Sequence, residues 1–270
     1  MAVHIEDVTI GSAPLTVPSP EARFRLEPSP RRVRVIFGGE TIADSVHVLL
    51  LLEHRHLPVF YFPLKDMRTE ALERTEHTTE SDLKGTATYW TVRAGDRVAE
   101  NTAWSYDAPP PDGPDLKGHV AFYWNEMDAW YEEEERAFAH ARDPYKLIDT
   151  RQSSRHVRIE HAGETVAETR RPQLIFETGL PVRYYIPTED VRMDLLEPSA
   201  TKSQCAYKGE ASYWSLRVGE QVYPDVAWYY SEPLTLVKPV AGLVAFFQER
   251  VDKVFVDGEQ IERPNTPWAR

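Results

Sequence analysis

Two lysines, Lys84 and Lys208, stand in the same local sequence 124 residues apart, each followed by a glycine and then by aromatic residues. A lysine beside aromatic rings can hold a carboxylate or phosphate as a point charge. A buried lysine can also act as a nucleophile. The structural alternative is a lysine that is solvated at a turn or paired with a nearby glutamate. Both lysines are therefore candidate catalytic and ligand-binding residues.

Aromatic residues accompany each lysine in the same order. They are Tyr89, Trp90, Trp104 and Tyr106 in the first case, and Tyr213, Trp214, Trp228 and Tyr230 in the second. Neighbouring residues of a strand point to opposite faces, so one ring of each adjacent Tyr-Trp pair should face the core and the other a cleft or solvent. Rings that share a face can form a stacking pocket for a flat ligand or a cation. The alternative for any single ring is a place in the core.

A third group of chemically active residues precedes Lys84. Glu73, Arg74 and His77 bring an acid, a base and an imidazole close together in the sequence, and His77 could serve as a general acid–base group. The matching segment before Lys208 keeps the glutamate as Glu197 but has lost the arginine and the histidine. Glu73, Arg74 and Glu197 are candidate ligand-binding residues, and His77 is a candidate catalytic residue.

The single cysteine, Cys205, comes shortly before Lys208, with Tyr207 between them as a further candidate ligand-binding residue. A thiol beside a lysine could be a nucleophile, and a buried, inert cysteine is the alternative. One cysteine provides no Cys-x-x-Cys pair for zinc.

His54 and His56 share a strand face beside Glu53, but the second copy has no histidines there, so we expect a surface segment. We predict no metal and no cofactor.

The elements that must position these residues occur twice. From Lys84 to Tyr106, 11 of 23 residues are identical to those 124 positions later, where composition alone would give roughly one or two. This predicts two copies of one domain, over residues 31–136 and 155–262. Residues 1–30 are then an extended N-terminal segment, 137–154 a linker and 263–270 a tail. A change of offset to 123 at the Leu-Pro-Val of residues 57–59 and 180–182 predicts a one-residue insertion that is later compensated.

The hydrophobic pattern within each copy is that of strands. Polar and apolar residues alternate over residues 32–37, and Gly38-Gly39 then offers a hairpin turn. Further strands are expected at residues 49–52, 58–62, 87–93, 120–124, 211–217 and 244–247, and a loop or single helical turn at 65–74 and 189–197. The acidic residues 132–135 indicate a solvated face or the start of a linker helix. The predicted fold class is mainly β, with two tandem small antiparallel β-sheet domains of about seven short strands and little helix.

Composition limits the possible partners. The formal net charge is −12 with a pI near 5.3, which opposes binding to a nucleic-acid backbone. No apolar run approaches the roughly 20 residues of a membrane helix, and the N-terminus does not resemble a secretory signal. We therefore expect a cytoplasmic protein that binds neither nucleic acid nor membrane. The oligomeric state stays open.

The ordered set of motifs resembles the bacterial family catalogued as domain of unknown function 427. The motifs are residues 32–35, 39–45, 72–79, 84–90, 103–106 and 120–123, and in the second copy residues 192–197, 205–214 and 254–259. The resemblance implies a small antiparallel β-tent fold, whose better-known members bind zinc through two cysteine pairs that this chain lacks. It also implies a Cys-Pro-Tyr pattern before the lysine, of which Cys205 and Tyr207 remain, whereas Ser81 and Leu83 stand in the first copy.

The resemblance supplies no reaction. The family is sometimes labelled nucleotidyltransferase-like, but the chain has no Gly-Ser turn followed by an Asp-x-Asp metal pair.

Two hypotheses for the function remain. Either the chain binds a small molecule in a pocket lined by Lys, Trp and Tyr, with catalysis left open, or it is a non-catalytic interaction module that uses a surface such as Trp130 and Tyr131. Since each copy keeps polar residues that the other lacks, the site is either composite or has decayed in one copy.

Overall fold

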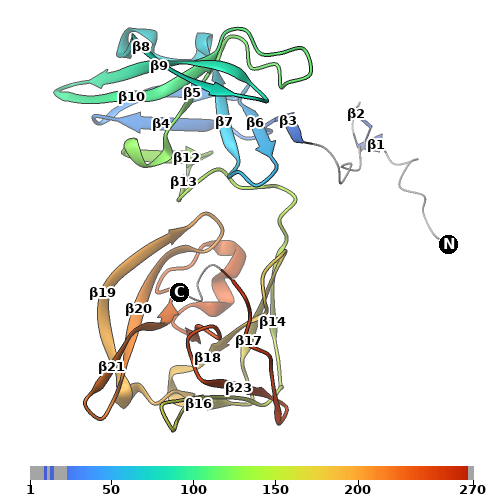
Figure 1. Ribbon diagram of the computed structural model, residues 1–270, viewed down its shortest axis with the longest axis vertical. Coiled ribbons are helices and arrows are strands. Elements are labelled where there is room, and N and C mark those ends of the chain that lie inside the picture. Colours follow the sequence, from blue (N-terminus) through green and yellow to red (C-terminus); the bar gives the residue numbers. More distant parts are fainter. Residues whose placement is uncertain (1–8, 11–12, 15–22, 267–270) are drawn as a thin grey trace. The chain divides into compact units, whose positions relative to one another are not determined.

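The computed structural model describes residues 9–10, 13–14 and 23–266, so parts of the predicted N-terminal segment and tail lie outside the described residues. The chain divides into two compact units, Met1–Glu126 and Met127–Arg270. Both are built from antiparallel strands, and all helical elements in the described residues are short 3-10 turns (Figure 1). The prediction of a mainly β chain with two tandem antiparallel domains is confirmed. None of the described helical elements is long and apolar enough to cross a membrane.

The first unit contains a seven-stranded sheet in the order β3-β6-β7-β11-β10-β9-β8. Its strands are β3 (Phe24–Pro28), β6 (Leu49–Glu53), β7 (Val59–Pro63), β8 (Leu72–Ser81), β9 (Gly85–Ala94), β10 (Arg97–Tyr106) and β11 (His119–Phe122). Outside this sheet, β4 (Val33–Phe37) pairs with β5 (Glu40–Ser45), and β1 (Thr9–Ile10) with β2 (Ala13–Pro14). The 3-10 turns are η2 (Leu64–Asp66), η3 (Thr69–Ala71) and η4 (Trp124–Glu126).

The second unit contains a matching seven-stranded sheet in the order β14-β17-β18-β22-β21-β20-β19 and a four-stranded sheet in the order β16-β15-β23-β24. The strands of these sheets are β14 (Ile148–Gln152), β15 (Val157–His161), β16 (Glu164–Thr169), β17 (Gln173–Glu177), β18 (Arg183–Ile186), β19 (Leu196–Cys205), β20 (Gly209–Val218), β21 (Gln221–Tyr229), β22 (Val244–Phe246), β23 (Lys253–Val256) and β24 (Glu259–Gln260). Outside them, β12 (Ala129–Glu132) pairs with β13 (Glu135–Ala137). The 3-10 turns are η5 (Thr188–Asp190), η6 (Met193–Leu195) and η7 (Thr235–Val240).

Strand pairing places the start of each sheet earlier than the predicted boundaries at residues 31 and 155. β3 pairs with β6 although it belongs to the predicted N-terminal segment, and β14 pairs with β17 although it belongs to the predicted linker. Both are edge strands of mixed polarity, which is why their sequences do not stand out from a linker. The linker of the second copy is therefore partly a strand of its sheet.

Strand register also corrects the predicted insertion. Leu51 lies opposite Val59 in the first unit, and Ile175 lies opposite Arg183 in the second, so the offset of 124 holds on both sides of the turn. The two turns have equal length, and the Leu-Pro-Val similarity is merely shifted by one residue within them. As a result, the structural counterpart of Arg183 is Val59.

Two further segments differ from the prediction. The acidic run at residues 132–135 forms a hairpin turn between β12 and β13, with residues 133–135 exposed, so the solvated face holds and the start of a linker helix does not. The ten-residue strands β8 and β19 were not predicted, because most of their side chains are exposed and their sequences do not alternate between apolar and polar residues. They are edge strands that pair along one side only, so their sequences carry no buried face.

The seven-stranded sheet of the second unit buries both faces along its inner strands, because alternate residues of these strands enter different clusters. One cluster lies against the four-stranded sheet and takes residues such as Leu174, Ile186 and Ala227. The other lies on the opposite face, with η7, and takes residues such as Tyr185 and Trp228. A strand that is buried on both faces reads as a continuous apolar run, as residues 184–186 and 244–247 do. The second face carries the candidate site.

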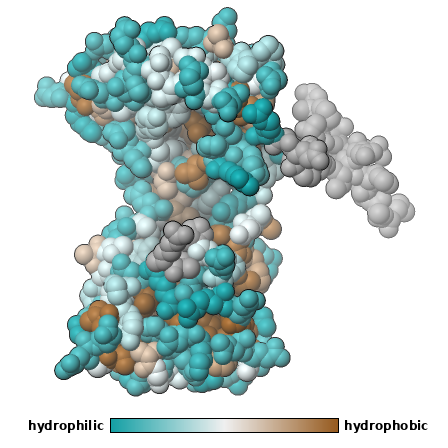
Figure 2. All heavy atoms as spheres, in the orientation of Figure 1, coloured by the Kyte–Doolittle hydropathy of each residue, from teal (hydrophilic) through white to brown (hydrophobic). Residues whose placement is uncertain are grey.

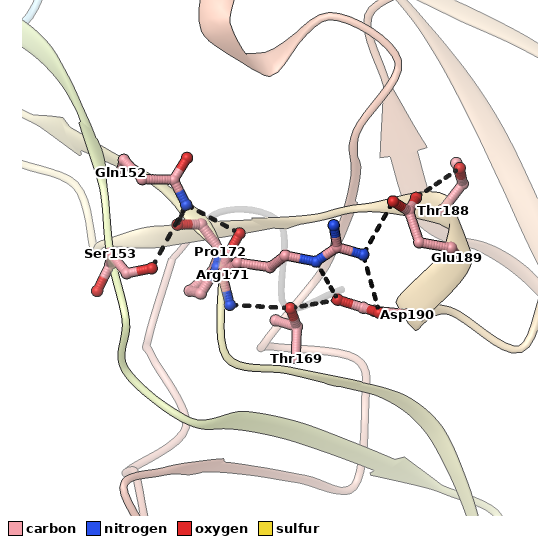
Figure 3. Close-up of polar contacts among 8 residues, drawn as sticks. All are labelled: Gln152, Ser153, Thr169, Arg171, Pro172, Thr188, Glu189 and Asp190. Atoms are coloured by element: carbon pink, nitrogen blue, oxygen red, sulfur yellow. Dashed lines mark hydrogen bonds and ion pairs between the residues drawn. The ribbon is translucent and has the colours of Figure 1, made fainter.

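A polar cluster ties the end of β16 to the turn η5 (Figure 3). The hydroxyl of Thr169 donates to Asp190 at 2.6 Å and accepts from the backbone N–H of Arg171, whose guanidinium reaches Asp190 and Glu189. Hydrogen bonds from Arg171 and Thr169 hold the pKa of Asp190 below its usual value. The first unit has the same contact between Ser45 and Asp66. Its recurrence marks the cluster as part of the framework of both copies.

A buried histidine distinguishes the second framework from the first. His161 at the end of β15 is 5% exposed, and neither ring nitrogen has a hydrogen-bond partner. It packs edge-on against Tyr223, and its Nδ1 lies 3.5 Å from Asp252. Burial lowers the pKa of His161, a shift that Asp252 opposes and Arg263 reinforces. The counterpart in the first unit is the fully buried Phe37.

We expect the second unit to lose stability as pH falls below about 6.5, the ordinary pKa of histidine, because the unfolded chain then binds a proton that folded His161 does not. His161→Phe removes this proton uptake. Thermal unfolding at about pH 7.5 and about pH 5.5 should show a smaller loss of Tm for the variant than for the wild type. Equal losses in both proteins would contradict this role of His161.

Candidate functional site

The turn between β8 and β9 sets the position of the first lysine, and the turn between β19 and β20 sets that of the second. In each, a three-residue loop ends at a glycine with positive φ, 80° at Gly85 and 94° at Gly209. Glycine adopts this conformation without the steric cost that a Cβ would bring, and such loops join strands in register. The residue before the glycine is the lysine, which therefore leaves the hairpin at the same place in both copies.

Each lysine is paired with a glutamate from a non-neighbouring strand. Lys84 Nζ binds Glu53 of β6, and Lys208 Nζ binds Glu177 of β17. The side chains are 12% and 16% exposed in the first pair and 13% and 8% in the second. The structural alternative for the lysines, a pairing with a nearby glutamate, is thus what the structure has. Because the pair is mostly withdrawn from water, its geometry is fixed and its charges are weakly screened.

Glu177 has a second cationic partner. Lys146 Nζ lies 2.9 Å from its other carboxylate oxygen. Burial opposes ionisation of Glu177, but Lys208 and Lys146 outweigh this effect and hold its pKa below the ordinary value. Lys146 also lies over the ring of Tyr207, with Nζ 5.4 Å from the ring centroid. Two ammonium groups therefore share one carboxylate in the second unit.

Aromatic rings lie beside each lysine–glutamate pair, in the same arrangement in both units. Trp228 donates its indole N–H to the hydroxyl of Tyr185 at 3.1 Å, and the two rings meet edge-on. Phe247 lies 4.4 Å from Trp228 and stacks on Tyr213 with an interplanar angle of 11°. The first unit repeats this arrangement with Trp104, Tyr61, Tyr123 and Tyr89. Burial and the hydrogen bond between the hydroxyls of Tyr123 and Tyr89 raise the pKa of Tyr123 to about 12.

These groups surround a cavity of about 310 Å³ in the second unit. Its lining residues come from the sheet, from the β19–β20 turn and from the segment before β14. They are His140, Lys146, Ile175, Glu177, Leu180, Arg183, Tyr185, Ser203, Gln204, Cys205, Tyr207, Lys208, Tyr213, Trp228, Tyr230 and Phe247. The structure thus brings six sequence candidates together, namely Cys205, Tyr207, Lys208, Tyr213, Trp228 and Tyr230.

Residues of the predicted linker help to enclose this cavity. Arg142 donates to the backbone carbonyl of Ala206 at 2.8 Å, and the hydroxyl of Tyr207 accepts from the backbone N–H of Asp143 at 2.8 Å. These bonds hold the segment against the β19–β20 turn and place Lys146 beside Glu177. A part for the linker in a site was not predicted. Lys146 carries no sequence signal, because the residue 124 positions earlier is Ala22 and the lysine therefore does not recur.

A second buried ion pair supports the cavity wall. Arg183 binds Glu249 through two hydrogen bonds of 2.8 and 2.6 Å, and the Glu249 side chain is fully buried. The guanidinium also lies 5.7 Å from the ring centroid of Trp228. A paired charge beside an indole ring fixes both side chains. The counterparts in the first unit are Val59 and Asn125, so this support belongs to the second copy.

Other predicted site residues lie elsewhere. Trp214 is partly buried and packs against the core on the opposite face of the sheet, and Trp90 donates to Ser105 on the matching face of the first unit. Glu73 and Glu197 form exposed ion pairs with Arg93 and Arg217. Arg74 binds the exposed Asp107, and His77 lies 4.5 Å from the ring of Tyr89. Tyr89, Trp104 and Tyr106 do share one cluster in the first unit, beside Lys84.

The glutamate partners are among the site residues that sequence reasoning missed. Glu53 was considered only with His54 and His56, which are exposed, and the described residues contain no cluster of groups suited to a metal ion. These glutamates could have been found from the sequence, because Glu53 and Glu177 are also separated by the offset of 124. A carboxylate that is repeated along with a lysine points to an ion pair, although the sequence does not show that they meet.

A comparison with models of known protein families matches the chain to one family. The model of a family described as a domain of unknown function (DUF427) matches the chain twice, over residues 25–133 and 149–257. No curated protein matches the chain. The two matched ranges begin inside β3 and β14, in agreement with the sheet boundaries.

Proposed function

The chain belongs to the family of this domain of unknown function (DUF427), with two tandem copies, and we propose that its second copy binds a small molecule in the cavity beside Lys208. The observation that carries the proposal is the cavity itself, whose volume of about 310 Å³ lies within the range of ligand sites in proteins. It combines ring walls with a few polar groups, which is the usual composition of such sites.

The ring walls favour a flat ligand. Trp228, Phe247 and Tyr213 present faces and edges that are held in place by packing and by the bond from Trp228 to Tyr185. A rigid wall loses little conformational entropy when a ligand binds, so more of the contact energy appears as affinity. The ammonium of Lys208 and the hydroxyl of Tyr230 supply polar contacts within the same cavity.

The interaction-module hypothesis has less support. Trp130, one of the two residues proposed for a docking surface, is 3% exposed. On the face drawn in Figure 2, hydrophilic residues cover most of the surface of both units, and hydrophobic residues lie in small scattered groups. Scattered apolar residues are normal on a monomer and do not mark a docking surface. Small-molecule binding is therefore the function that we propose.

Cys205 offers a direct test because it is the single cysteine and lines the cavity. Ring compounds found by ligand-observed NMR should slow the alkylation of Cys205 by iodoacetamide at concentrations near their dissociation constants. The physical reason is that a ligand beside Lys208 covers the thiol. The measurement is the labelling rate, followed by mass spectrometry as a function of ligand concentration.

The first copy provides the control. In the double variant Ser81→Cys/Cys205→Ser, the only thiol stands at the matching position of the first unit. Ligands of the second cavity should leave its labelling rate unchanged. Ring compounds that bind the chain without slowing labelling of Cys205, or a screen that finds no binder, would overturn the proposed function.

A further inference from the structure

The charges around the cavity do not balance. Three cationic side chains line it, namely Lys146, Arg183 and Lys208, whereas Glu177 is the lining carboxylate. Glu249 compensates Arg183 through its two hydrogen bonds. The two lysines are left with Glu177, so the site holds one positive charge more than it holds negative charges. In a chain with a net charge of −12, this local excess is opposite in sign to the whole molecule.

The lysines also keep hydrogen-bonding capacity. Each ammonium has three N–H donors, and a carboxylate accepts from both with its two oxygens. Lys208 binds one oxygen of Glu177 and Lys146 lies beside the other, which leaves further donors on both ammonium groups. Their side chains are only 13% and 29% exposed, so water reaches these donors less than it would at a surface.

Tyr230 adds a donor that none of the described residues accepts from. Its side chain is buried, with 4% of the residue exposed, and it lines the cavity. Among the described residues its hydroxyl has no hydrogen-bond partner. Burial raises the pKa of Tyr230, so the group stays a neutral phenol that can donate. Because Tyr230 lines the cavity, its hydroxyl can donate to water or to a ligand that enters there.

We propose, building on the proposed function, that the ligand is a small planar monocarboxylate, with its anionic end bound by Lys146, Lys208 and the Tyr230 hydroxyl and its ring among Tyr213, Trp228 and Phe247. One carboxylate neutralises the one excess charge. A phosphate monoester carries about −1.5 to −2 at neutral pH and would leave the site negative. In the first unit Glu53 is paired with the ammonium of Lys84, and its other oxygen lies 3.8 Å from the imidazole of His56. A second lysine at Glu53 is absent among the described residues, so the preference belongs to the second copy.

Benzoate, benzamide and phenyl phosphate are matched probes, since they share the ring and differ in charge. The readout is the concentration that halves the alkylation rate of Cys205, with each variant referred to its own rate without ligand. We expect benzoate to halve the alkylation rate of Cys205 at a concentration about tenfold or more below that needed for benzamide or phenyl phosphate. The reason is that the carboxylate accepts charge-assisted hydrogen bonds, which are stronger than those between neutral groups.

Two variants test the residues. Lys146→Gln should weaken protection by benzoate about tenfold and leave protection by benzamide unchanged. Lys238→Gln in η7 makes the same change of net charge at an exposed site outside the cavity lining. This variant should change neither the protection by benzoate nor that by benzamide. Tyr230→Phe removes only the hydroxyl and should weaken benzoate binding several-fold without loss of fold, because that hydroxyl serves no other described residue.

The outcomes separate this inference from the proposed function. Equal protection by benzoate and benzamide, or full benzoate protection in Lys146→Gln, would overturn the monocarboxylate and leave a binding cavity. Stronger protection by phenyl phosphate than by benzoate would also overturn it. If no ring compound of any charge protected Cys205, both the inference and the proposed function would fail.

Discussion

Replacement of Glu249 by asparagine is expected to lower the free energy of unfolding of the second unit by about 3–5 kcal/mol. The carboxylate is fully buried and forms two hydrogen bonds with Arg183, whose side chain is 11% exposed. The shorter, neutral asparagine leaves the guanidinium partly unsatisfied in a place that water hardly reaches. Calorimetry of the full chain should show the transition of the second unit at a lower temperature.

The first copy provides the matching rescue. Its residues at these positions are Val59 and Asn125. The double variant Arg183→Val/Glu249→Asn copies that pair and removes both charges together, so it should recover most of the lost stability. A single variant as stable as the wild type, or a double variant less stable than the single one, would contradict the assigned role of the ion pair.

Glu177→Gln is expected to have opposite effects on stability and on ligand binding. The variant leaves the ammonium groups of Lys208 and Lys146 with a neutral amide, which should lower the free energy of unfolding by about 2–4 kcal/mol. It also adds one positive charge to the cavity, so benzoate should bind more tightly than to the wild type. Saturating benzoate should then raise the Tm of the variant more than that of the wild type, since ligand binding adds to folded-state stability.

Glu53→Gln is the matched control for this prediction. It breaks the equivalent pair with Lys84 in the first unit. The variant should lower the stability of that unit and leave protection of Cys205 by benzoate unchanged. A tighter benzoate complex in Glu53→Gln, or a weaker one in Glu177→Gln, would contradict the electrostatic account of the cavity.

The duplication explains how much of the fold could be predicted. Internal repetition gave two equivalent domains, and alternation around Tyr213-Trp214 gave the division of these rings between two faces. Both inferences use local periodicity, which a sequence displays directly. The polar edge strand β19 was missed because its pairing partner lies along one side only, so a buried face is absent from its pattern.

The candidate site was less accessible to sequence reasoning. Lys208 and Trp228 were found because they recur, and the cavity confirms that they lie together. Lys146, Arg183 and Glu249 do not recur in the first copy, since they belong to what changed after duplication. Repetition identifies a shared framework, whereas the specificity of one copy depends on residues that the other copy lacks. Only the folded arrangement brings those residues to one place.

The most direct test of the ligand cavity is a crystal structure of the full chain with benzoate, or with another ring compound that protects Cys205. We predict that the ligand lies in the cavity of the second unit, with its carboxylate within hydrogen-bond distance of Lys208 and Lys146 and its ring against Trp228. A ligand bound outside this cavity, with the space beside Lys208 filled by water alone, would contradict the proposal.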